Sequence, residues 1–514
     1  MSASSQGAVQ PQPRRRVVKR GKRKTAVDRV AQADQTVEDS LAKFAGVFQI
    51  PTPKFLLRDA YIRFVLVATL GFYFSLDMLN AIFFLEGALF SGKLNAFRQL
   101  AILSLFALAL PYVLIARKNL RTILKSQIPL IMLLSFCALS VLWTLSPGST
   151  QVRVIALFIQ VFTFLAIYAA RPSKAFFFDC LCLASAPILI FNLLSFFVEL
   201  NPFVLFKEAG YYGYFTNKNT FGIFSMVSAG IWTCALLHYK TQRMRALSLA
   251  MVLIAAYYLY ISDSKTALAV ALIALPPALL LAFSVKSGQR PTFYTLLVSM
   301  LVLIGFGFVL TWIGLDPITE EVYGDTTFTG RTEIWGQLWR VIQQDPWLGV
   351  GFRAFWDAGA NSPHLALPDP VNFLNQGHNG YIDVILTLGF IGLGLLMLYL
   401  LQPFFALVRI ARYYGGPAHS TPLLAVFLYF PLCAMLHNIT ESSYLTIDTT
   451  IFATVVFSTM VVSSINRKFD RLVVEAPPKK PAQAAPGPVA DRQRSPGTPS
   501  PKPGMMAHQP GRRP

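Results

Sequence analysis

Long apolar stretches separated by short polar connections dominate the chain between residues 61 and 465. Most of them run for about 17–25 residues with almost no charge, which is typical of helices that cross a bilayer. The pattern predicts an all-α polytopic membrane protein with about twelve transmembrane helices. The predicted spans are residues 61–79, 96–116, 127–146, 152–170, 175–199, 219–238, 246–261, 266–284, 292–314, 379–401, 421–437 and 447–465. Residues 246–284 form either a tight hairpin or one broken segment.

Basic residues fall on alternate connections between these spans. The positive-inside rule assigns connections rich in Lys and Arg to the cytoplasm. This rule puts both termini in the cytoplasm and the long connection 315–378 outside. The basic connections are those at residues 117–125, 171–174, 240–245, 286–290 and 409–412.

The formal net charge of +20 follows from this topology and from the amino-terminal tail. Each basic residue near an anionic membrane surface contributes roughly 1 kcal/mol of attraction, so we expect membrane lipid rather than nucleic acid as the partner. The hydrophilic start of the chain argues against a cleavable signal peptide. Residues 1–58 are predicted to be a basic disordered tail, and residues 467–514 a Pro-rich disordered tail.

The connection 315–377 is too long to be a simple linker. Ile334, Leu338 and Ile342 recur in it at helical spacing until Pro346 ends the pattern, and three tryptophans accompany them. Tryptophan favours the membrane–water boundary. We therefore predict an amphipathic helix over residues 331–344 that lies on the outer face of the bilayer.

Two residues near this connection are candidates for catalysis. Arg331 would occupy the first turn of the amphipathic helix, where a guanidinium and free N–H groups suit phosphate oxygens; the alternative is an arginine that reaches lipid headgroups. His378 lies at the start of the span 379–401. A helix N-terminus disfavours imidazolium, which suits a general base, although a structural hydrogen bond is the alternative role.

Other polar residues are predicted to lie on the same side of the membrane. Amide, cationic and aromatic groups together suit an anionic lipid head that carries sugars, whereas each alone fits interfacial anchoring. The chain has no Asp-x-Asp pair and no metal-ligand spacing, and its five cysteines all lie in apolar spans, so we predict neither a metal site nor a cofactor. The candidate binding residues are Lys265, Lys218, Asn217, Asn219, Asn379, Glu441 and Tyr214.

Five short motifs follow one another in the chain between roughly residues 205 and 400. They are Asn217-Lys218-Asn219-x-x-Gly222, Ser262-x-Ser264-Lys265, Phe328-Thr329-Gly330-Arg331-Thr332-x-x-Trp335, Pro346-Trp347-Leu348-Gly349-x-Gly351, and His378-Asn379 followed after nine residues by Gly389-x-x-Gly392. In the order and spacing of these motifs the chain resembles the O-antigen ligase and Wzy-type polymerase superfamily of bacterial inner-membrane proteins. Lys265 departs from the arginine usual in the family, so a bidentate fork is lost at that position.

This resemblance implies a GT-C-like glycosyltransferase whose active site faces the periplasm. The donor would be an oligosaccharide on undecaprenyl diphosphate, attacked by an acceptor hydroxyl with inversion and without a metal or nucleotide sugar. His378 would activate that hydroxyl, and Arg331 with Lys265 would hold the departing diphosphate. Chain-length regulators and export proteins would be further partners.

Polymerases and ligases of this superfamily differ in their acceptor. The basic tail, the Pro-rich end and the residues around Arg331 and Glu441 are most similar to exopolysaccharide polymerases of the succinoglycan type, so polymerisation is the predicted activity. A ligase is the alternative. A lipid-linked glycan transporter would place charged groups near the bilayer midplane, whereas the candidates here gather at one face. A non-catalytic scaffold recruited through its tails is the remaining alternative.

Overall fold

The computed structural model describes residues 59–83, 96–170, 174–198, 210–287, 294, 329–413, 421–447 and 449–475. In these residues the predicted all-α polytopic membrane class is confirmed, because eight helices are long and apolar enough to cross a membrane and three shorter apolar helices accompany them. The predicted span 292–314, apart from Tyr294, and the predicted tail 1–58 lie outside the described residues.

The apolar helices coincide with the other predicted spans. The eight long ones are α2 (Asp59–Phe83), α3 (Ala96–Ile115), α6 (Pro147–Ala170), α7 (Lys174–Leu193), α8 (Lys218–His238), α9 (Gln242–Ile261), α10 (Lys265–Ser287) and α15 (Gly380–Tyr413). The shorter ones are α5 (Ile128–Leu139), α16 (Thr421–His437) and the first part of α17 (Thr450–Glu475). The carboxyl-terminal tail was predicted to be disordered from residue 467; this boundary is wrong, because α17 continues to Glu475.

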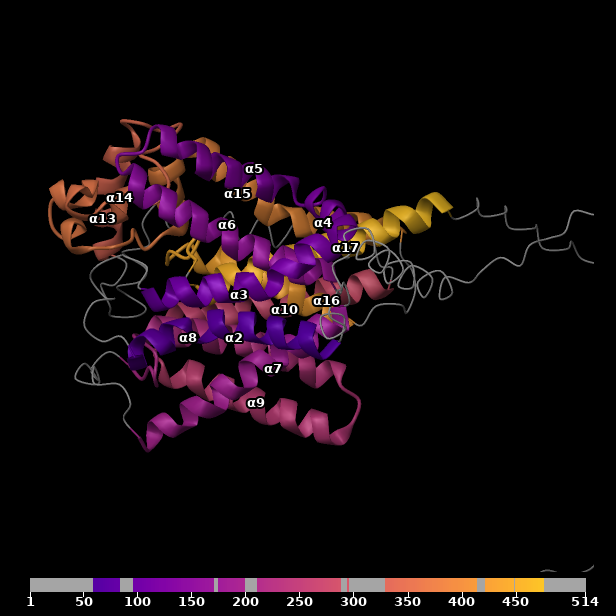
Figure 1. Ribbon diagram of the computed structural model, residues 1–514. Helices are drawn as coiled ribbons and strands as arrows, with labels where there is room; N and C mark the ends of the chain where they lie inside the picture. The colour runs from indigo at the N-terminus through magenta and orange to yellow at the C-terminus, as the bar shows by residue number, and fades with distance from the viewer. Residues whose placement is uncertain are drawn as a thin grey trace, which may run out of the picture. The chain divides into compact units, whose positions relative to one another are not determined.

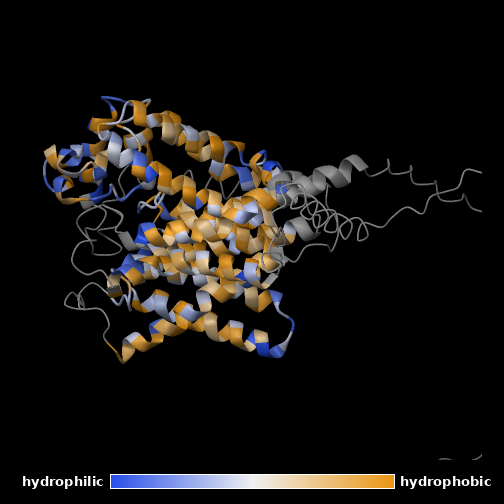
Figure 2. Ribbon diagram, viewed as in Figure 1, coloured by the Kyte–Doolittle hydropathy of each residue, from blue (hydrophilic) through white to orange (hydrophobic). Residues whose placement is uncertain are grey.

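The described residues up to Asp470 form one compact unit, to which all these helices belong apart from the end of α17. In this unit α8 packs against α9, α10 and α16, while α3 packs against α6, α2 against α7 and α15 against α5 (Figure 1). Apolar residues cover the middle of the helices and hydrophilic residues gather near their ends (Figure 2). The hairpin at residues 246–284 is confirmed, since α9 ends at Ile261 and α10 begins at Lys265.

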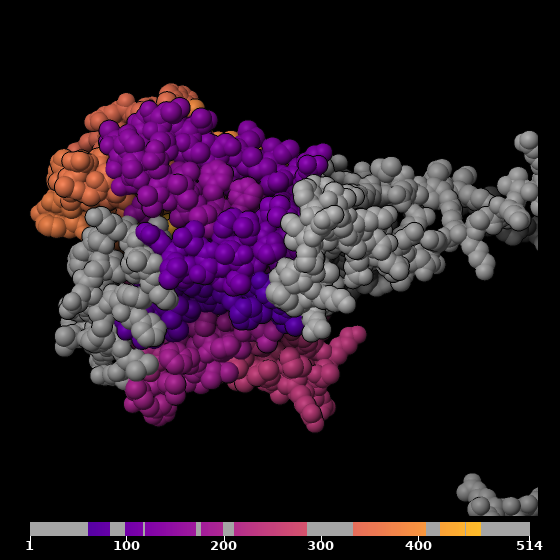
Figure 3. Space-filling model, in the orientation of Figure 1, coloured from indigo at the N-terminus to yellow at the C-terminus, as the bar shows by residue number. Residues whose placement is uncertain are grey.

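The connections predicted to be external meet at one end of the unit, which we call the capped end. The cap itself contains α13 (Thr329–Ile342), α14 (Ala354–Asp357) and short 3-10 turns. The backbone N–H of Phe352 donates to Ser140 at the end of α5, at 3.0 Å. Thr216, just before α8, donates its hydroxyl to Asp77 near the end of α2, at 2.7 Å. The space-filling view shows the cap packed directly against the surface of α5 and α6 (Figure 3).

Helix α13 forms where the spacing predicts a helix, but its apolar face does not lie on the bilayer. Ile334, Trp335, Leu338 and Ile342 are buried in a cluster with residues of α14 and of the first turns of α15. The helix itself was predicted correctly, but its apolar face packs against protein and not against lipid as predicted. Helical spacing shows that one face is apolar but does not distinguish lipid from protein as the partner of that face.

Helix α15 is interrupted at Gly389, where φ is 63° and ψ is −172°. The interruption frees backbone groups, and the segment 346–351 of the cap bonds to them. Phe390 N–H donates to the carbonyl of Pro346 at 2.8 Å. On the other side of the break, the N–H groups of Val350 and Gly351 donate to carbonyls of α15, each at 3.0 Å. The two glycine-containing motifs that were recognised separately in the sequence are therefore two halves of one backbone junction.

Replacing Gly389 by alanine is expected to destabilise the protein by about 2–4 kcal/mol. A Cβ atom at this position would collide with the carbonyl of Trp347, and a positive φ with extended ψ is open to glycine almost alone. Thermal unfolding of the detergent-solubilised variant measures the loss.

The control is Gly394→Ala in the same helix, where a Cβ atom meets nothing within 4 Å. Equal melting temperatures for the two variants would contradict the strained junction.

Candidate active site

A single buried carboxylate, Glu441, lies at the centre of the polar residues of the capped end. It belongs to the connection between α16 and α17, and its side chain is only 7% exposed. Arg331 donates from Nη2 to Glu441 Oε1 at 3.2 Å and from Nη1 to the carbonyl of Thr440 at 2.7 Å. The second oxygen, Oε2, lies 3.5 Å from Nδ1 of His378. One carboxylate thus contacts both residues that the sequence singled out as candidates for catalysis.

The amino-terminal ends of several helices meet around this carboxylate. Asn219, in the first turn of α8, donates to Glu441 Oε1 at 3.4 Å and accepts from Ser264, just before α10, at 3.3 Å. Arg331 lies in the first turn of α13, and the first N–H of α15, from Gly380, donates to the backbone carbonyl of Glu441 at 2.9 Å. Each helix start carries partial positive charge, so the region suits anions such as a diphosphate.

The turn that carries His378 is held from several sides. Its backbone is left-handed, with φ at 50°, a strained conformation for a residue other than glycine. The N–H of Gly377 donates to Asp383 at 3.0 Å, and the indole of Trp335 donates to the carbonyl of Gly377 at 2.9 Å. Asn379 caps α15, because its Oδ1 accepts from the N–H groups of Tyr381 and Ile382. These bonds fix the backbone and leave the imidazole 26% exposed.

Burial alone would raise the pKa of Glu441, but its neighbours reverse the effect. The nearby imidazole of His378 and the charge of Arg331 together lower the pKa of Glu441 below its ordinary value. Glu441 is therefore a carboxylate at neutral pH. Nδ1 of His378 lies 3.5 Å from Oε2 of this carboxylate, and an imidazole that carries a proton on one ring nitrogen can accept a proton on the other.

The structure brings together four of the predicted site residues: His378, Arg331, Glu441 and Asn219. Lys265 is exposed at the start of α10. Lys218 pairs with Asp263 at 3.5 Å, and the side chain of Asn217 caps α8 by accepting from the N–H groups of Asn219 and Thr220. Asn217 and Asn379, two of the predicted binding residues, therefore act as helix caps. Asn379 is fully buried.

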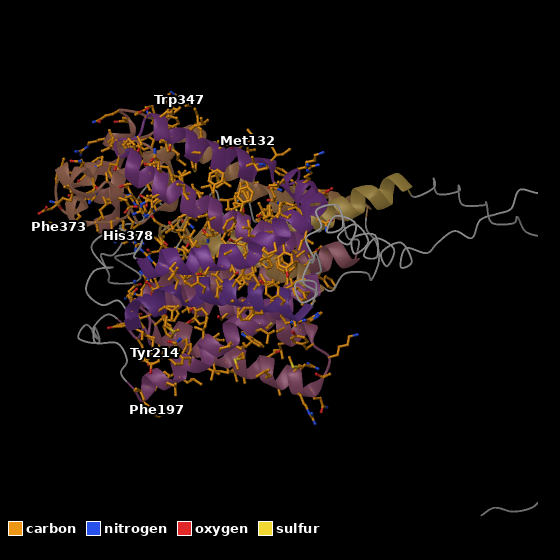
Figure 4. The ribbon with its side chains drawn as sticks, viewed as in Figure 1. Met132, Phe197, Tyr214, Trp347, Phe373 and His378 are labelled. Atoms are coloured by element: carbon orange, nitrogen blue, oxygen red, sulfur yellow. The ribbon has the colours of Figure 1, made fainter. Side chains whose placement is uncertain are left out.

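Tyr214 does not join the cluster. Its ring is 1% exposed and packs against Phe191, and its hydroxyl donates to the carbonyl of Val198 at 2.8 Å. Figure 4 shows Tyr214 well apart from His378. Tyr214 lies on a connection at the capped end, as predicted. The apolar contacts that bury its ring come from residues distant in the sequence, so the residues next to Tyr214 do not reveal them.

Three further residues, which are not among the candidate site residues, lie at the site. Asp383 anchors Gly377, as described above. Asn438 is fully buried, and its Oδ1 accepts from the N–H groups of Ser443 and Tyr444 and so folds the connection that carries Glu441. His437 is buried at the end of α16, beside the charges of Glu441 and Arg331. An acidic residue in the first turn of α15 was a detectable signal for Asp383, because that position favours negative charge.

Potential metal ligands do not cluster in the part of the chain that the structure describes: it contains no group of three or more His, Cys, Asp or Glu residues suited to a metal ion. The side chains that the structure places around Glu441 are the guanidinium of Arg331, the imidazole of His378 and the amide of Asn219.

A family model matches the middle of the chain. Residues 249–397, which include α10, α13 and the start of α15, match the family model described as O-antigen ligase. The helices and this match together support a multi-pass membrane protein with a region similar to that family.

The chain is also similar to a curated protein, the exopolysaccharide production protein ExoQ of Rhizobium meliloti (strain 1021). The two are 28% identical over 340 residues, which cover 64% of this chain and 76% of the relative. Residues 249–397 thus resemble an O-antigen ligase domain, and a larger part of the chain resembles a protein of exopolysaccharide production.

Because Asn379 acts as a helix cap, its replacement is expected to affect stability first. Asn379→Ala should lower the free energy of unfolding by about 1 kcal/mol, and Asn379→Ser should restore most of it, since serine also caps helices. Thermal unfolding of the two variants in detergent measures this. If Asn379→Ala is as stable as the wild type but binds substrate more weakly, Asn379 is a binding residue rather than a helix cap.

Proposed function

We propose that this protein polymerises undecaprenyl-diphosphate-linked oligosaccharide repeat units into exopolysaccharide at the periplasmic face of the bacterial inner membrane. The observation that carries the proposal is the meeting of Arg331 and His378 on one buried carboxylate. A proton acceptor and a fork-shaped cation at one end of a membrane bundle fit transfer of a sugar from a lipid diphosphate. The similarity to an exopolysaccharide production protein supports polymerisation as the outcome.

His378 is proposed as the general base. Nε2 accepts the proton of the acceptor hydroxyl as its oxygen attacks the anomeric carbon, and the bond between that carbon and the diphosphate oxygen breaks. The attack inverts the anomeric configuration. Undecaprenyl diphosphate leaves with the bonding electron pair, and the acceptor chain now carries the transferred sugars.

Arg331 is proposed to stabilise the leaving diphosphate. Its planar guanidinium can bind two phosphate oxygens at once, and the helix starts of α8 and α10 add partial positive charge. Lys265 and Lys218 lie at those starts and would add full charges, although Lys265 lacks the bidentate geometry of an arginine. Negative charge that develops on the leaving oxygen is thus met by groups already in position.

A ligase remains the second candidate function, because the family model that matches residues 249–397 is described as O-antigen ligase. A ligase would use the same donor and the same groups but a different acceptor. A transporter is less consistent with the structure, since the candidate groups lie together at one end of the helices.

Replacing His378 by alanine is expected to slow chain growth at least about 10²-fold, because it removes the proposed acceptor of the hydroxyl proton. Purified protein is mixed with the lipid-linked repeat unit of its host, and the products are separated on a gel. In a short incubation the wild-type protein should give a ladder of repeats and the variant none.

Thermal unfolding of His378→Ala supplies the control for folding. Long polymer made by a normally folded variant would contradict the role of His378 as general base. If wild-type protein consumes the donor only when another acceptor is supplied, the protein is a ligase; if it consumes no donor with any acceptor, the glycosyltransferase proposal fails.

Arg331→Lys is expected to lower the polymerisation rate at least about tenfold, because an ammonium replaces a fork that reaches both Thr440 and Glu441. Steady-state rates over a range of donor concentrations measure this. Arg340→Lys is the matched control, since Arg340 is exposed on the same helix. Equal rates for the two variants would reduce Arg331 to a structural role.

A further inference from the structure

We propose that Glu441 is a positioning residue that couples the general base to the diphosphate-binding arginine, each through a different oxygen. This inference rests on the proposed function. Oε1 accepts from Arg331 at 3.2 Å and from Asn219 at 3.4 Å, whereas Oε2 faces Nδ1 of His378 at 3.5 Å. The sequence had placed Glu441 among the groups that contact substrate. Its side chain is only 7% exposed, one oxygen is hydrogen-bonded and the other faces His378, so it acts through its neighbours.

The first task of Glu441 is to select and hold the reactive form of the imidazole. A carboxylate beside Nδ1 favours the tautomer that carries its proton there, which leaves Nε2 as the acceptor. When Nε2 takes the hydroxyl proton, the ring becomes a cation next to an existing negative charge. The carboxylate therefore stabilises the protonated base during the transfer, as an acidic partner does in other base-assisted sites.

The second task is to share charge between the two steps of the reaction. Without substrate, Glu441 compensates the charge of Arg331, so a buried cation is not left unpaired. As the diphosphate leaves, its negative charge attracts the same guanidinium, while His378 becomes a cation that attracts the carboxylate. The pairing can thus shift from Arg331–Glu441 toward His378–Glu441 and Arg331–diphosphate with no charge left uncompensated.

The way the carboxylate is held agrees with a role beyond a simple ion pair. Asn438 folds the connection, the backbone carbonyl of Glu441 accepts from Gly380, and Asn219 fixes Oε1. These contacts come from the starts of α8 and α15 as well as from the connection itself. Arg331 alone would require only one oxygen, whereas the other is directed at the base.

The test is Glu441→Gln, which keeps the size of the side chain and removes its charge. We expect kcat of polymerisation to fall about 10²-fold with KM for the lipid-linked donor nearly unchanged. Glu441→Asp is the second variant, because it keeps the negative charge in this region but shortens the side chain and so moves the carboxylate away from His378 as well as from Arg331. It should fold normally and also lose rate. Glu333→Gln on α13, where the carboxylate is exposed, is the matched control and should polymerise at the wild-type rate.

A double mutant separates positioning from a merely structural effect. The residual transfer by His378→Ala is followed over a long incubation and compared with that of the double variant. If Glu441 acts through His378, then Glu441→Gln should slow the wild type about 10²-fold but should slow this residual transfer hardly at all. Equal slowing in both backgrounds, or full activity of Glu441→Gln, would overturn the inference while leaving the proposed function intact. Failure of the wild-type protein to transfer any sugar would instead refute the proposed function itself.

Discussion

The interruption of α15 at Gly389 is the constraint on which the arrangement of the capped end depends. Backbone groups released inside a membrane protein must find partners within the protein, since the hydrocarbon supplies none. The segment 346–351 supplies them on both sides of the break. This junction fixes the position of the chain after α13 and before α14, so the cap is attached to the same helix that begins beside His378.

From that junction the site follows by short steps. The buried face of α13 packs against the first turns of α15, which brings Arg331 toward the start of that helix. The connection after α16 folds on Asn438 and presents Glu441 between the two. Arg331 and His378 are thus placed by backbone bonds and apolar contacts, and the carboxylate then fixes the orientation of their side chains. In these segments the backbone and the apolar side chains stabilise the fold, while the polar side chains form the candidate site.

Much of this architecture could be predicted from the sequence. Apolar length fixed the helices, because a bilayer demands about 20 apolar residues for each crossing. Charge on alternate connections correctly grouped the ends that meet at the cap. Spacing also placed α13, and chemistry at helix starts pointed to Arg331 and His378, whose side chains both approach Glu441.

What failed depends on long-range packing. The apolar face of α13 was assigned to lipid because helical periodicity cannot name the partner of a face. Tyr214 was assigned to the site because an aromatic ring on an external connection could stack on a sugar ring. Its ring instead packs in the core beside Phe191. Asn379 belongs to a motif but caps a helix, so membership in a motif did not separate residues that fold the site from those proposed to react.

The contact between Arg331 and Glu441 joins residues that are 110 positions apart in the chain. During synthesis the amino-terminal part emerges first, so Arg331 is made and inserted well before its partner exists. The arginine can gain its buried counter-charge only after α16 has been threaded into the membrane. The nascent chain therefore lacks a complete candidate site until its last helices have been inserted. The site forms only when the helix bundle itself is assembled.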